Sequence, residues 1–264
     1  MKIAAAQISC RLGDFDANVG KVGHFAARAK RSGAELVIFP EMTDTGYSMP
    51  VIEKHARAWK NGAVCELEKV AKENSIAIVA GISDRDGDSI FNAQVLVDSK
   101  GEILAKYRKT HLVTAAPLDE RVCLSPGNEF ITCEVNRFKV GLSICYDLRF
   151  PEMARTLVVK HGANVIVNSS AWPAVRGEHL RILALARAVE NQSYFVIANR
   201  VGTDDGVSFF GSSMIIDPSG KLLAGASSDR EELIEAEISK QVIEEVRNGV
   251  AVFAHRRGEL YNVS

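Results

Sequence analysis

The sequence has no CxxC pair and no cluster of histidines near any of its cysteines. Zinc sites and disulfide frameworks depend on such spacings, so neither is expected, and no metal is predicted. Free thiols fit a reducing compartment better, and we expect the protein to work in the cytoplasm. The cysteines are Cys10, Cys65, Cys123, Cys133 and Cys145.

Long basic runs and long apolar runs are missing as well. The formal net charge is -1 at pH 7, and the longest basic run is His255-Arg256-Arg257. The sequence therefore has no electrostatic footprint for nucleic acid or a membrane surface. The apolar run at residues 3–8 is too short for a signal peptide, and no later run approaches membrane-spanning length. We expect neither a nucleic-acid partner nor a membrane partner.

The sequence does contain enough apolar material for a large core, because 47% of its 264 residues are hydrophobic. Residues 2–9 and 35–39 have the continuous apolar character of buried strands, and residues 16–32 have apolar side chains at helical spacing. Strand, helix and strand in this order predict a sheet covered by helices. Residues 51–74 are expected to be mainly helical, and residues 76–81 to form a third buried strand.

The second half of the chain repeats the first, with an offset of roughly 120 to 130 residues. Residues 161–167 resemble 32–38, residues 191–198 resemble 74–81, and residues 214–224 resemble 95–105. Chance similarity of turns is the alternative, but agreement at three points in the same order favours two similar halves. Two sheets, each with one bare face, can pack together as a four-layer α-β-β-α sandwich. We predict one α/β domain over residues 1–264, with residues 248–264 as a tail at a subunit interface.

Residues 138–162 form the stretch around which we expect a site. Alternating apolar residues predict a strand up to Ile144, and apolar residues at helical spacing from Leu148 predict a helix that Gly162 ends. Cys145 lies at the junction. Backbone N–H groups and the positive end of the helix are expected to lower the pKa of its thiol and make it a nucleophile. The alternative is a buried structural cysteine.

Glu41 and Lys109 each follow closely after a predicted strand, as Cys145 does. Taken singly, Glu41 has an ordinary interpretation as an exposed carboxylate and Lys109 as a solvated charge. Together the three match one chemistry, because a thiol that attacks an amide needs a base, an oxyanion stabiliser and an acid for the departing nitrogen. Spacing alone leaves His111 and His179 open as bases, although no Cys/His spacing competes well.

Several separated motifs resemble the nitrilase, or carbon-nitrogen hydrolase, superfamily, and the resemblance covers nearly the whole chain. The matching stretches are Ala4-Ala5-Ala6-Gln7, Val37-Ile38-Phe39-Pro40-Glu41, Tyr107-Arg108-Lys109-Thr110-His111-Leu112, Ser125-Pro126-Gly127, Gly141-Leu142-Ser143-Ile144-Cys145-Tyr146-Asp147-Leu148-Arg149-Phe150-Pro151-Glu152 and Arg187-Ala188-Val189-Glu190-Asn191-Gln192. The resemblance implies the four-layer sandwich, a homodimer whose sheets and helices continue across the interface, and no metal or organic cofactor.

The resemblance also implies roles for the residues that match. Glu41 is expected to be the general base, Lys109 the stabiliser of the transition state and Cys145 the nucleophile, with the backbone N–H of Tyr146 as a second oxyanion donor. Glu120 lies in the long irregular stretch after Lys109, where the family commonly has a second glutamate that orients the lysine and the substrate. The implied reaction is hydrolysis of a small linear amide through a thioester, with release of ammonia.

The residues after the cysteine bear on the substrate. True nitrilases resemble Cys-Trp-Glu here, whereas Cys145-Tyr146-Asp147-Leu148-Arg149 is similar to the Nit-type amidases, including ω-amidases, whose substrate carries a carboxylate. A guanidinium fork matches a carboxylate, so Arg149 is expected to bind it; in the alternative, Arg149 pairs with Glu152 and only supports the turn. Trp172 and Tyr47 are expected to line the acyl pocket, with core packing as the equal alternative.

Other functions stay open on the sequence alone. Hydrolysis of an N-carbamoyl amine would use the same three residues and release carbon dioxide as well as ammonia. Transfer of the acyl group to another amine would require the exclusion of water. A catalytically dead binding or scaffold protein is disfavoured because all three residue types are present. A thiol redox protein would need a resolving cysteine, and only Cys10 or Cys133 could approach Cys145 in space.

Overall fold

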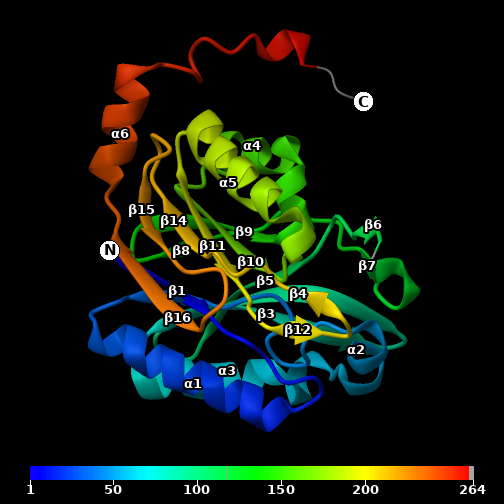
Figure 1. Ribbon diagram of the computed structural model, residues 1–264. Helices are drawn as coiled ribbons and strands as arrows, with labels where there is room; N and C mark the ends of the chain where they lie inside the picture. Colours follow the sequence, from blue (N-terminus) through cyan, green and yellow to red (C-terminus); the bar gives the residue numbers. More distant parts are fainter. Residues whose placement is uncertain (117, 262–264) are drawn as a thin grey trace.

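Two six-stranded sheets face each other in the computed structural model, and helices cover the outer face of each sheet (Figure 1). The structure describes residues 1–116 and 118–261. The order of strands is β16-β1-β2-β3-β4-β5 in the first sheet and β15-β14-β11-β10-β9-β8 in the second. The predicted α-β-β-α arrangement is confirmed.

The first sheet comes mainly from the first half of the chain. Its strands are β1 (Lys2–Gln7), β2 (Leu36–Ile38), β3 (Ala77–Asp86), β4 (Ser89–Val97), β5 (Ile103–Arg108) and β16 (Glu232–Glu237). β1, β2 and β3 are parallel, whereas β4, β5 and β16 pair antiparallel with their neighbours. The helices of this half are α1 (Phe15–Arg31), α2 (Met49–His55) and α3 (Ala63–Asn74), of which α1 and α3 cover the sheet.

The second sheet comes from the second half. Its strands are β8 (Thr132–Val135), β9 (Phe138–Ile144), β10 (Val165–Ser170), β11 (Tyr194–Asn199), β14 (Met214–Ile216) and β15 (Leu222–Gly225). It is covered by α4 (Pro151–Val159) and α5 (Gly177–Asn191), and α6 (Lys240–Gly249) follows β16. Two small hairpins join β6 (Thr114–Ala115) to β7 (Leu118–Asp119) and β12 (Thr203–Asp204) to β13 (Val207–Ser208).

Both sheets have the same connectivity, as the internal repeat predicted. β9, β10 and β11 are parallel and correspond to β1, β2 and β3, while β14 and β15 correspond to β4 and β5. An antiparallel strand, β8 or β16, flanks the first strand of each set. Ligand sites of α/β sheets form outside the carboxyl ends of parallel strands, so residues just past β2, β9 and β10 are positioned to share one site.

The burial of each element explains its sequence. Every residue of β10 and β11 is buried, because one face of this sheet meets the first sheet and the other meets α4 and α5. Helix α1 instead buries one face, which includes Val22, Phe25 and Ala29. Its N-terminus is capped by the Asp14 carboxylate, which accepts a hydrogen bond from the backbone N–H of Ala17 (3.2 Å).

Two predicted helices differ from the observed ones. The helix expected over residues 51–74 is interrupted between α2 and α3, because Arg85 of β3 donates to the carbonyl of Ala56 (3.0 Å) and pairs with Ala58 in an isolated bridge. The helix expected from Leu148 begins at Pro151, after a 3-10 turn. Within the described part of the chain, no helix is both long and apolar enough to cross a membrane.

Candidate active site

Glu41 lies in the turn that follows β2, and its side chain is fully buried. Its carboxylate accepts hydrogen bonds from the Nζ of Lys109 (2.9 Å), the Nδ2 of Asn92 (2.6 Å) and the backbone N–H of Ala171 (2.8 Å). Burial raises the pKa of Glu41, an effect that the charge of Lys109 only partly offsets. Glu41 is therefore not the exposed loop carboxylate of the ordinary interpretation.

Lys109 directly follows β5 and is also fully buried. Its ammonium lies 2.9 Å from a carboxylate oxygen of Glu41 and 2.9 Å from the carboxylate of Glu120. Burial alone would lower the pKa of Lys109, but the charges of Glu120 and Glu41 outweigh it and hold this pKa above its ordinary value. Lys109 is thus a charged group inside the protein, not a solvated one.

Glu120 starts a 3-10 turn directly after β7, and its buried carboxylate completes this cluster. Besides Lys109, it binds the Nδ2 of Asn92 (3.0 Å) and the backbone N–H of Val113 (2.8 Å). One amide nitrogen of Asn92 therefore bridges the carboxylates of Glu41 and Glu120. The sequence analysis did not identify Asn92; its only signal is a polar residue in the middle of the largely apolar β4.

Cys145 directly follows β9 and starts the 3-10 turn Cys145–Arg149. Its φ of +41° is a left-handed conformation that residues other than glycine rarely adopt. Burial and the charge of Glu41 raise the pKa of the thiol well above its ordinary value, although Lys109 opposes the shift. The predicted lowering of this pKa is wrong, because burial outweighs the nearby cation and α4 begins only at Pro151.

The buried carboxylate of Asp147 ties the cysteine turn to the loop that carries the lysine. It accepts hydrogen bonds from the hydroxyl of Tyr107 (2.7 Å) and the backbone N–H of Ile144 (2.9 Å), and it lies 2.7 Å from the Nδ1 of His111. His111 also stacks on Phe150, with 3.7 Å between ring centroids. These contacts occupy His111, which is not a lining residue of the cavity described next.

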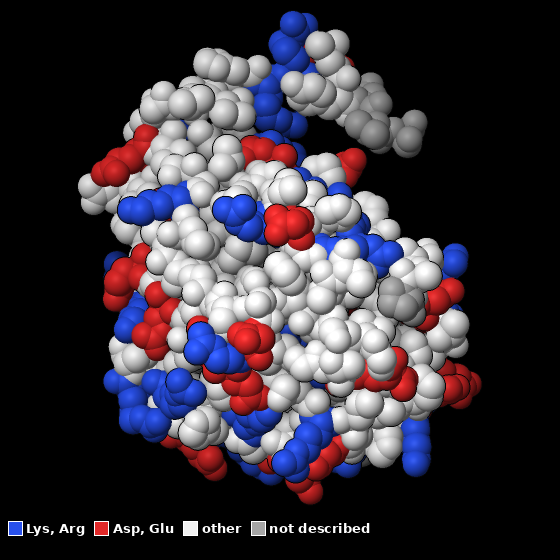
Figure 2. Space-filling view, viewed as in Figure 1, with Lys and Arg blue, Asp and Glu red and all other residues white. Residues whose placement is uncertain are grey.

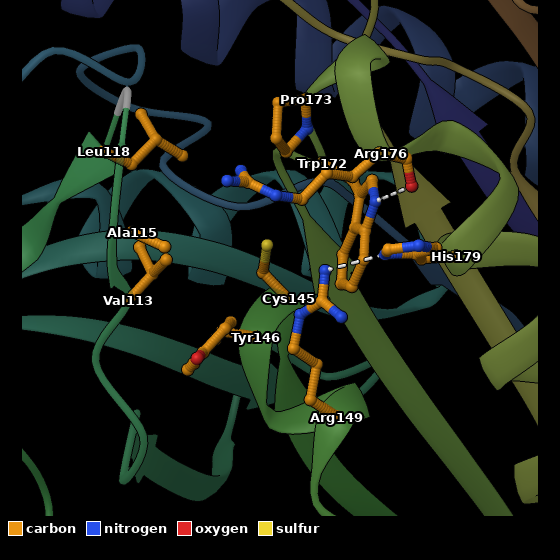
Figure 3. Close-up of a pocket in the computed structure, with 10 residues that line it drawn as sticks. All are labelled: Val113, Ala115, Leu118, Cys145, Tyr146, Arg149, Trp172, Pro173, Arg176 and His179. Carbon is orange, nitrogen blue, oxygen red and sulfur yellow. Dashed lines mark hydrogen bonds between the residues drawn. The ribbon is translucent and has the colours of Figure 1, made fainter.

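The sulfur of Cys145 points into a cavity of about 230 Å³ (Figure 3). Its lining residues are Val113, Ala115, Leu118, Cys145, Tyr146, Arg149, Trp172, Pro173, Arg176 and His179. Apolar side chains make most of the wall, and no acidic side chain of the described residues lines it. Figure 3 shows Arg149 and Arg176 on two sides of the sulfur. Two guanidinium groups without a lining acid favour an anionic ligand.

Arg149 and Trp172 both line this cavity and contact each other. The guanidinium carbon of Arg149 is 4.8 Å from the centroid of the Trp172 ring, a cation–π arrangement that holds the arginine at the cavity wall. In residues 1–116 and 118–261, Arg149 forms no ion pair with Glu152, so the alternative role in the turn is not supported. The backbone N–H of Tyr146, near the start of the 3-10 turn, has no acceptor of its own helix, as is general for this position.

Tyr47 lies outside the predicted acyl pocket. Its backbone N–H donates to the carboxylate of Asp204 (2.8 Å), its ring packs edge-on against Phe209, and it lines a neighbouring cavity. Burial, followed by the charges of Glu120 and Glu41, raises the pKa of its hydroxyl well above the ordinary value. Tyr47 thus lies beside the carboxylate cluster and does not line the cavity of Cys145.

The placement of the cysteines and of other metal-ligating side chains is known for the part of the chain that the structure covers. No group of three or more His, Cys, Asp or Glu side chains among the described residues is placed to hold a metal ion. All five cysteines are free thiols. Neither Cys10 nor Cys133 shares the cavity of Cys145, so neither is in the position of a resolving cysteine.

Comparison with known proteins gives consistent matches over nearly the full chain. The family model described as Carbon-nitrogen hydrolase matches residues 2–248. The chain is 35% identical over 260 residues to the 2-oxoglutaramate amidase of Bacillus subtilis (strain 168), covering 98% of each. It is 32% identical over 255 residues to the omega-amidase of Homo sapiens, covering 93% of this chain and 91% of that one.

Solved structures agree with these matches. A structure of the amidase from Nesterenkonia sp. AN1, which shows Michael addition of acrylamide at its active-site cysteine, has a TM-score of 0.87, 28% identity and 98% coverage of both chains. The NitFhit protein of C. elegans has a TM-score of 0.91 and 30% identity, covering 98% of this chain and 66% of that one. The chain belongs to the carbon-nitrogen hydrolase family.

Proposed function

We propose that this chain hydrolyses a small linear amide that carries a carboxylate, with Cys145 as nucleophile, Glu41 as general base and acid, and Lys109 as stabiliser of the oxyanion. The observation that carries the proposal is the buried ammonium of Lys109, held between the carboxylates of Glu41 and Glu120, whose charges all act on the thiol of Cys145. Burying three charges costs stability, and buried clusters of this kind are found mainly at functional sites.

The electrostatics of the site fit these roles. The raised pKa of Cys145 keeps its thiol protonated at neutral pH, so attack on an amide requires a base. The raised pKa of Glu41 makes its carboxylate a stronger proton acceptor than an exposed glutamate. Lys109 keeps its proton and positive charge, which suits it to hold a developing oxyanion. Glu120 and Asn92 fix the lysine and the base in position.

In the first half-reaction, Glu41 takes the proton of the Cys145 thiol as the sulfur attacks the carbonyl carbon. Lys109 and the backbone N–H of Tyr146 hold the oxygen, which becomes negatively charged. The protonated Glu41 then gives its proton to the nitrogen, the carbon–nitrogen bond breaks, and ammonia leaves a thioester on Cys145.

In the second half-reaction, Glu41 takes a proton from a water molecule that attacks the thioester. The carbon–sulfur bond breaks, the carboxylic acid product leaves, and the proton returns to the sulfur of Cys145. One carboxylate therefore serves both steps. The mechanism uses only side chains and backbone groups of this chain.

The carboxylate on the substrate is supported by the charge of the cavity and by the relatives. Arg149 lines the cavity and is not paired with an acid among the described residues. One relative is named 2-oxoglutaramate amidase, and 2-oxoglutaramate carries a carboxylate as well as an amide. An arginine opposite a carboxylate would fix the amide group above the sulfur.

The test is ammonia release, with carbon dioxide recorded in parallel, from ω-monoamides of dicarboxylic acids, simple aliphatic amides, N-carbamoyl amines and nitriles. We expect ammonia without carbon dioxide, with the highest kcat/KM for the ω-monoamides. Cys145→Ala should abolish turnover. Cys10→Ala is the matched control, because Cys10 is also buried with a raised thiol pKa but lies outside the cavity.

Two results would contradict the proposal. Activity that survives in Cys145→Ala would show that Cys145 is not the nucleophile. Carbon dioxide produced together with ammonia would instead assign the protein to hydrolysis of N-carbamoyl amines.

The C-terminal tail is proposed to contact a second copy of the chain in a homodimer. Beyond α6 it rests on the body through Phe253, which lies under the guanidinium groups of Arg155 and Arg247. Val250 and Tyr261 stay exposed, and Figure 2 shows part of the tail standing clear of the body. Residues 262–264 of the predicted tail lie outside the described residues. Light scattering should find a dimer that weakens when the chain is truncated after Gly249.

A further inference from the structure

Three nitrogen-bearing side chains meet at the mouth of the Cys145 cavity (Figure 3). Arg149 comes from the 3-10 turn after Cys145, Arg176 ends the 3-10 turn Ala174–Arg176, and His179 lies in the first turn of α5. Only Arg149 has a role in the proposed function. Arg176 and His179 therefore need an account of their own.

His179 holds Arg149 in place. The Nη2 of Arg149 lies 3.4 Å from the Nδ1 of His179. A guanidinium can only donate hydrogen bonds, so this Nδ1 has to accept and carries no proton in the arrangement observed. The indole of Trp172 supports the other side of the same guanidinium, at 4.8 Å. The imidazole and the indole together restrict where Arg149 can point.

Arg176 approaches from the opposite wall. Its backbone carbonyl accepts a hydrogen bond from the indole N–H of Trp172 (2.7 Å), and its Nη2 donates to the carbonyl of Ala116 (2.7 Å), between β6 and β7. This second bond ties Arg176 to the hairpin whose Ala115 and Leu118 line the same cavity. A guanidinium has five N–H donors, so one bond to a carbonyl leaves donors free for a ligand.

We propose that Arg176 is a second ligand for the substrate carboxylate, opposite Arg149, and that His179 is a positioning residue for Arg149. The inference rests on the proposed function and deepens it by naming the residues that select the charged end of the substrate. Two guanidinium groups on facing walls bind a carboxylate from two directions and so determine how far it lies from the sulfur of Cys145. Neutral amides lack the group that both arginines bind.

The test uses two substrates of equal chain length, succinamate and butanamide, which differ by a carboxylate in place of a terminal methyl group. Arg176→Gln should lower kcat/KM for succinamate roughly 10- to 100-fold, mainly through KM, because a hydrogen bond to a charged group is lost. The kcat/KM for butanamide should change by less than about threefold. Arg181→Gln is the matched control, since Arg181 is exposed on α5, which directly follows Arg176, and does not line the cavity.

The role of His179 is tested with the same pair of substrates. His179→Leu removes the acceptor and should raise KM for succinamate, whereas His179→Gln keeps an acceptor oxygen and should restore most of the affinity. Arg176→Lys keeps the positive charge but loses the two parallel N–H donors of the guanidinium. Its kcat/KM for succinamate should lie between the values for the wild type and Arg176→Gln.

Three outcomes separate the inference from the function on which it rests. Equal losses on both substrates in Arg176→Gln would overturn it, because Arg176 would then only hold the hairpin. Unchanged kinetics for succinamate in Arg176→Gln and His179→Leu would overturn it as well. A wild-type enzyme that hydrolyses butanamide as well as succinamate would instead refute the proposed carboxylate preference, and with it this inference.

Discussion

At the scale of single residues, the site depends on one buried cation. Lys109 separates the carboxylates of Glu41 and Glu120, each of which also binds the amide of Asn92. Without the ammonium, two negative charges would face each other with no solvent to screen them. The cation therefore stabilises the folded site, and in the proposed function it also holds the oxyanion.

Lys109→Met should abolish turnover and lower the free energy of unfolding at pH 7 by about 3 to 5 kcal/mol, because it leaves an uncompensated buried charge. The loss of stability should be smaller at pH 5 than at pH 7, because burial raises the pKa of Glu41 and its protonation removes one of the two negative charges. Urea denaturation at the two pH values measures both effects. Lys69→Met, at an exposed pair with Glu66, should leave the stability almost unchanged. A variant as stable as the wild type would contradict the account.

The sequence analysis named most residues of this cluster, but it did not predict how burial and neighbouring charges act on them. Glu41, Lys109, Cys145 and Glu120 were all identified, and the structure brings them together. The direction of the Cys145 pKa shift was wrong, because burial and the charge of a carboxylate from another strand set it. Asn92 was missed for the same reason, since its partners lie 51 and 28 residues away along the chain.

At the scale of elements, β3 supports the turn that carries Glu41. The backbone N–H of Gly81 donates to the carbonyl of Pro40 (3.0 Å), and its own carbonyl accepts from Thr43 (2.8 Å). A Cβ at Gly81 would lie 2.6 Å from the Cα of Glu41 and 2.7 Å from the oxygen of Pro40. Both atoms belong to the backbone, so the turn itself would have to move.

Gly81→Ala should therefore lower kcat by roughly 10- to 100-fold, because a displacement of about 1 Å at a catalytic base has effects of that size. Steady-state kinetics on the preferred amide give the measurement. Gly20→Ala, in α1 with no neighbour within 4 Å, should leave kcat unchanged and increase stability slightly. Full activity in Gly81→Ala would show that the position of the Glu41 turn does not depend on this close approach.

Helices and strands could be predicted from the sequence where the spacing of apolar residues alone determines them. The buried strands and the two similar halves follow from apolar patterns and are present. The 3-10 turn after Cys145 was not predicted, because it depends on Asp147 binding the N–H of Ile144 and on the proline that starts α4. The break between α2 and α3 likewise depends on a contact with Arg85, which no local pattern reveals.

At the scale of the whole molecule, a buried carboxylate links the Glu41 turn to β3 and makes folding sensitive to pH. Asp44 accepts hydrogen bonds from the backbone N–H (3.0 Å) and the hydroxyl (2.6 Å) of Ser83. Burial nevertheless raises the pKa of Asp44 from 3.8 to about 6, although these bonds oppose the shift. The folded state therefore binds a proton more tightly than the unfolded chain does.

The direction of this pH dependence follows from the difference in proton binding between the folded and the unfolded state. Because the folded pKa of Asp44 is the higher one, its stabilising contribution is complete below about pH 4 and is lost as the pH rises through about 6. The difference amounts to about 3 kcal/mol. Asp44→Asn should remove this dependence, so the stability of the variant relative to the wild type should rise between pH 4 and 7.

Urea denaturation across that range is the measurement, with Asp88→Asn as the control because Asp88 is exposed in a hairpin turn. A stability difference between Asp44→Asn and the wild type that is constant with pH would contradict the raised pKa.

The family, the sandwich fold and the reaction class, cysteine-dependent cleavage of an amide, are confirmed predictions. These predictions succeeded for a physical reason, because the internal repeat and the motifs that follow the strands each lie within short stretches of sequence. The wall of the cavity was harder to predict. Arg176 and His179 reach it from the turn before α5 and from α5 itself, whereas Tyr47, whose backbone N–H binds Asp204, does not line it. These positions depend on how distant segments pack.

The central claim is that an acyl group passes through Cys145. Rapid acid quenching of the enzyme during turnover of succinamate, followed by peptide mass spectrometry, tests it most directly. The account predicts a mass increase equal to succinamate minus ammonia on the peptide that contains Cys145, and no such increase on Cys10 or in Cys145→Ala. Ammonia release with the acyl group on another residue would contradict the account.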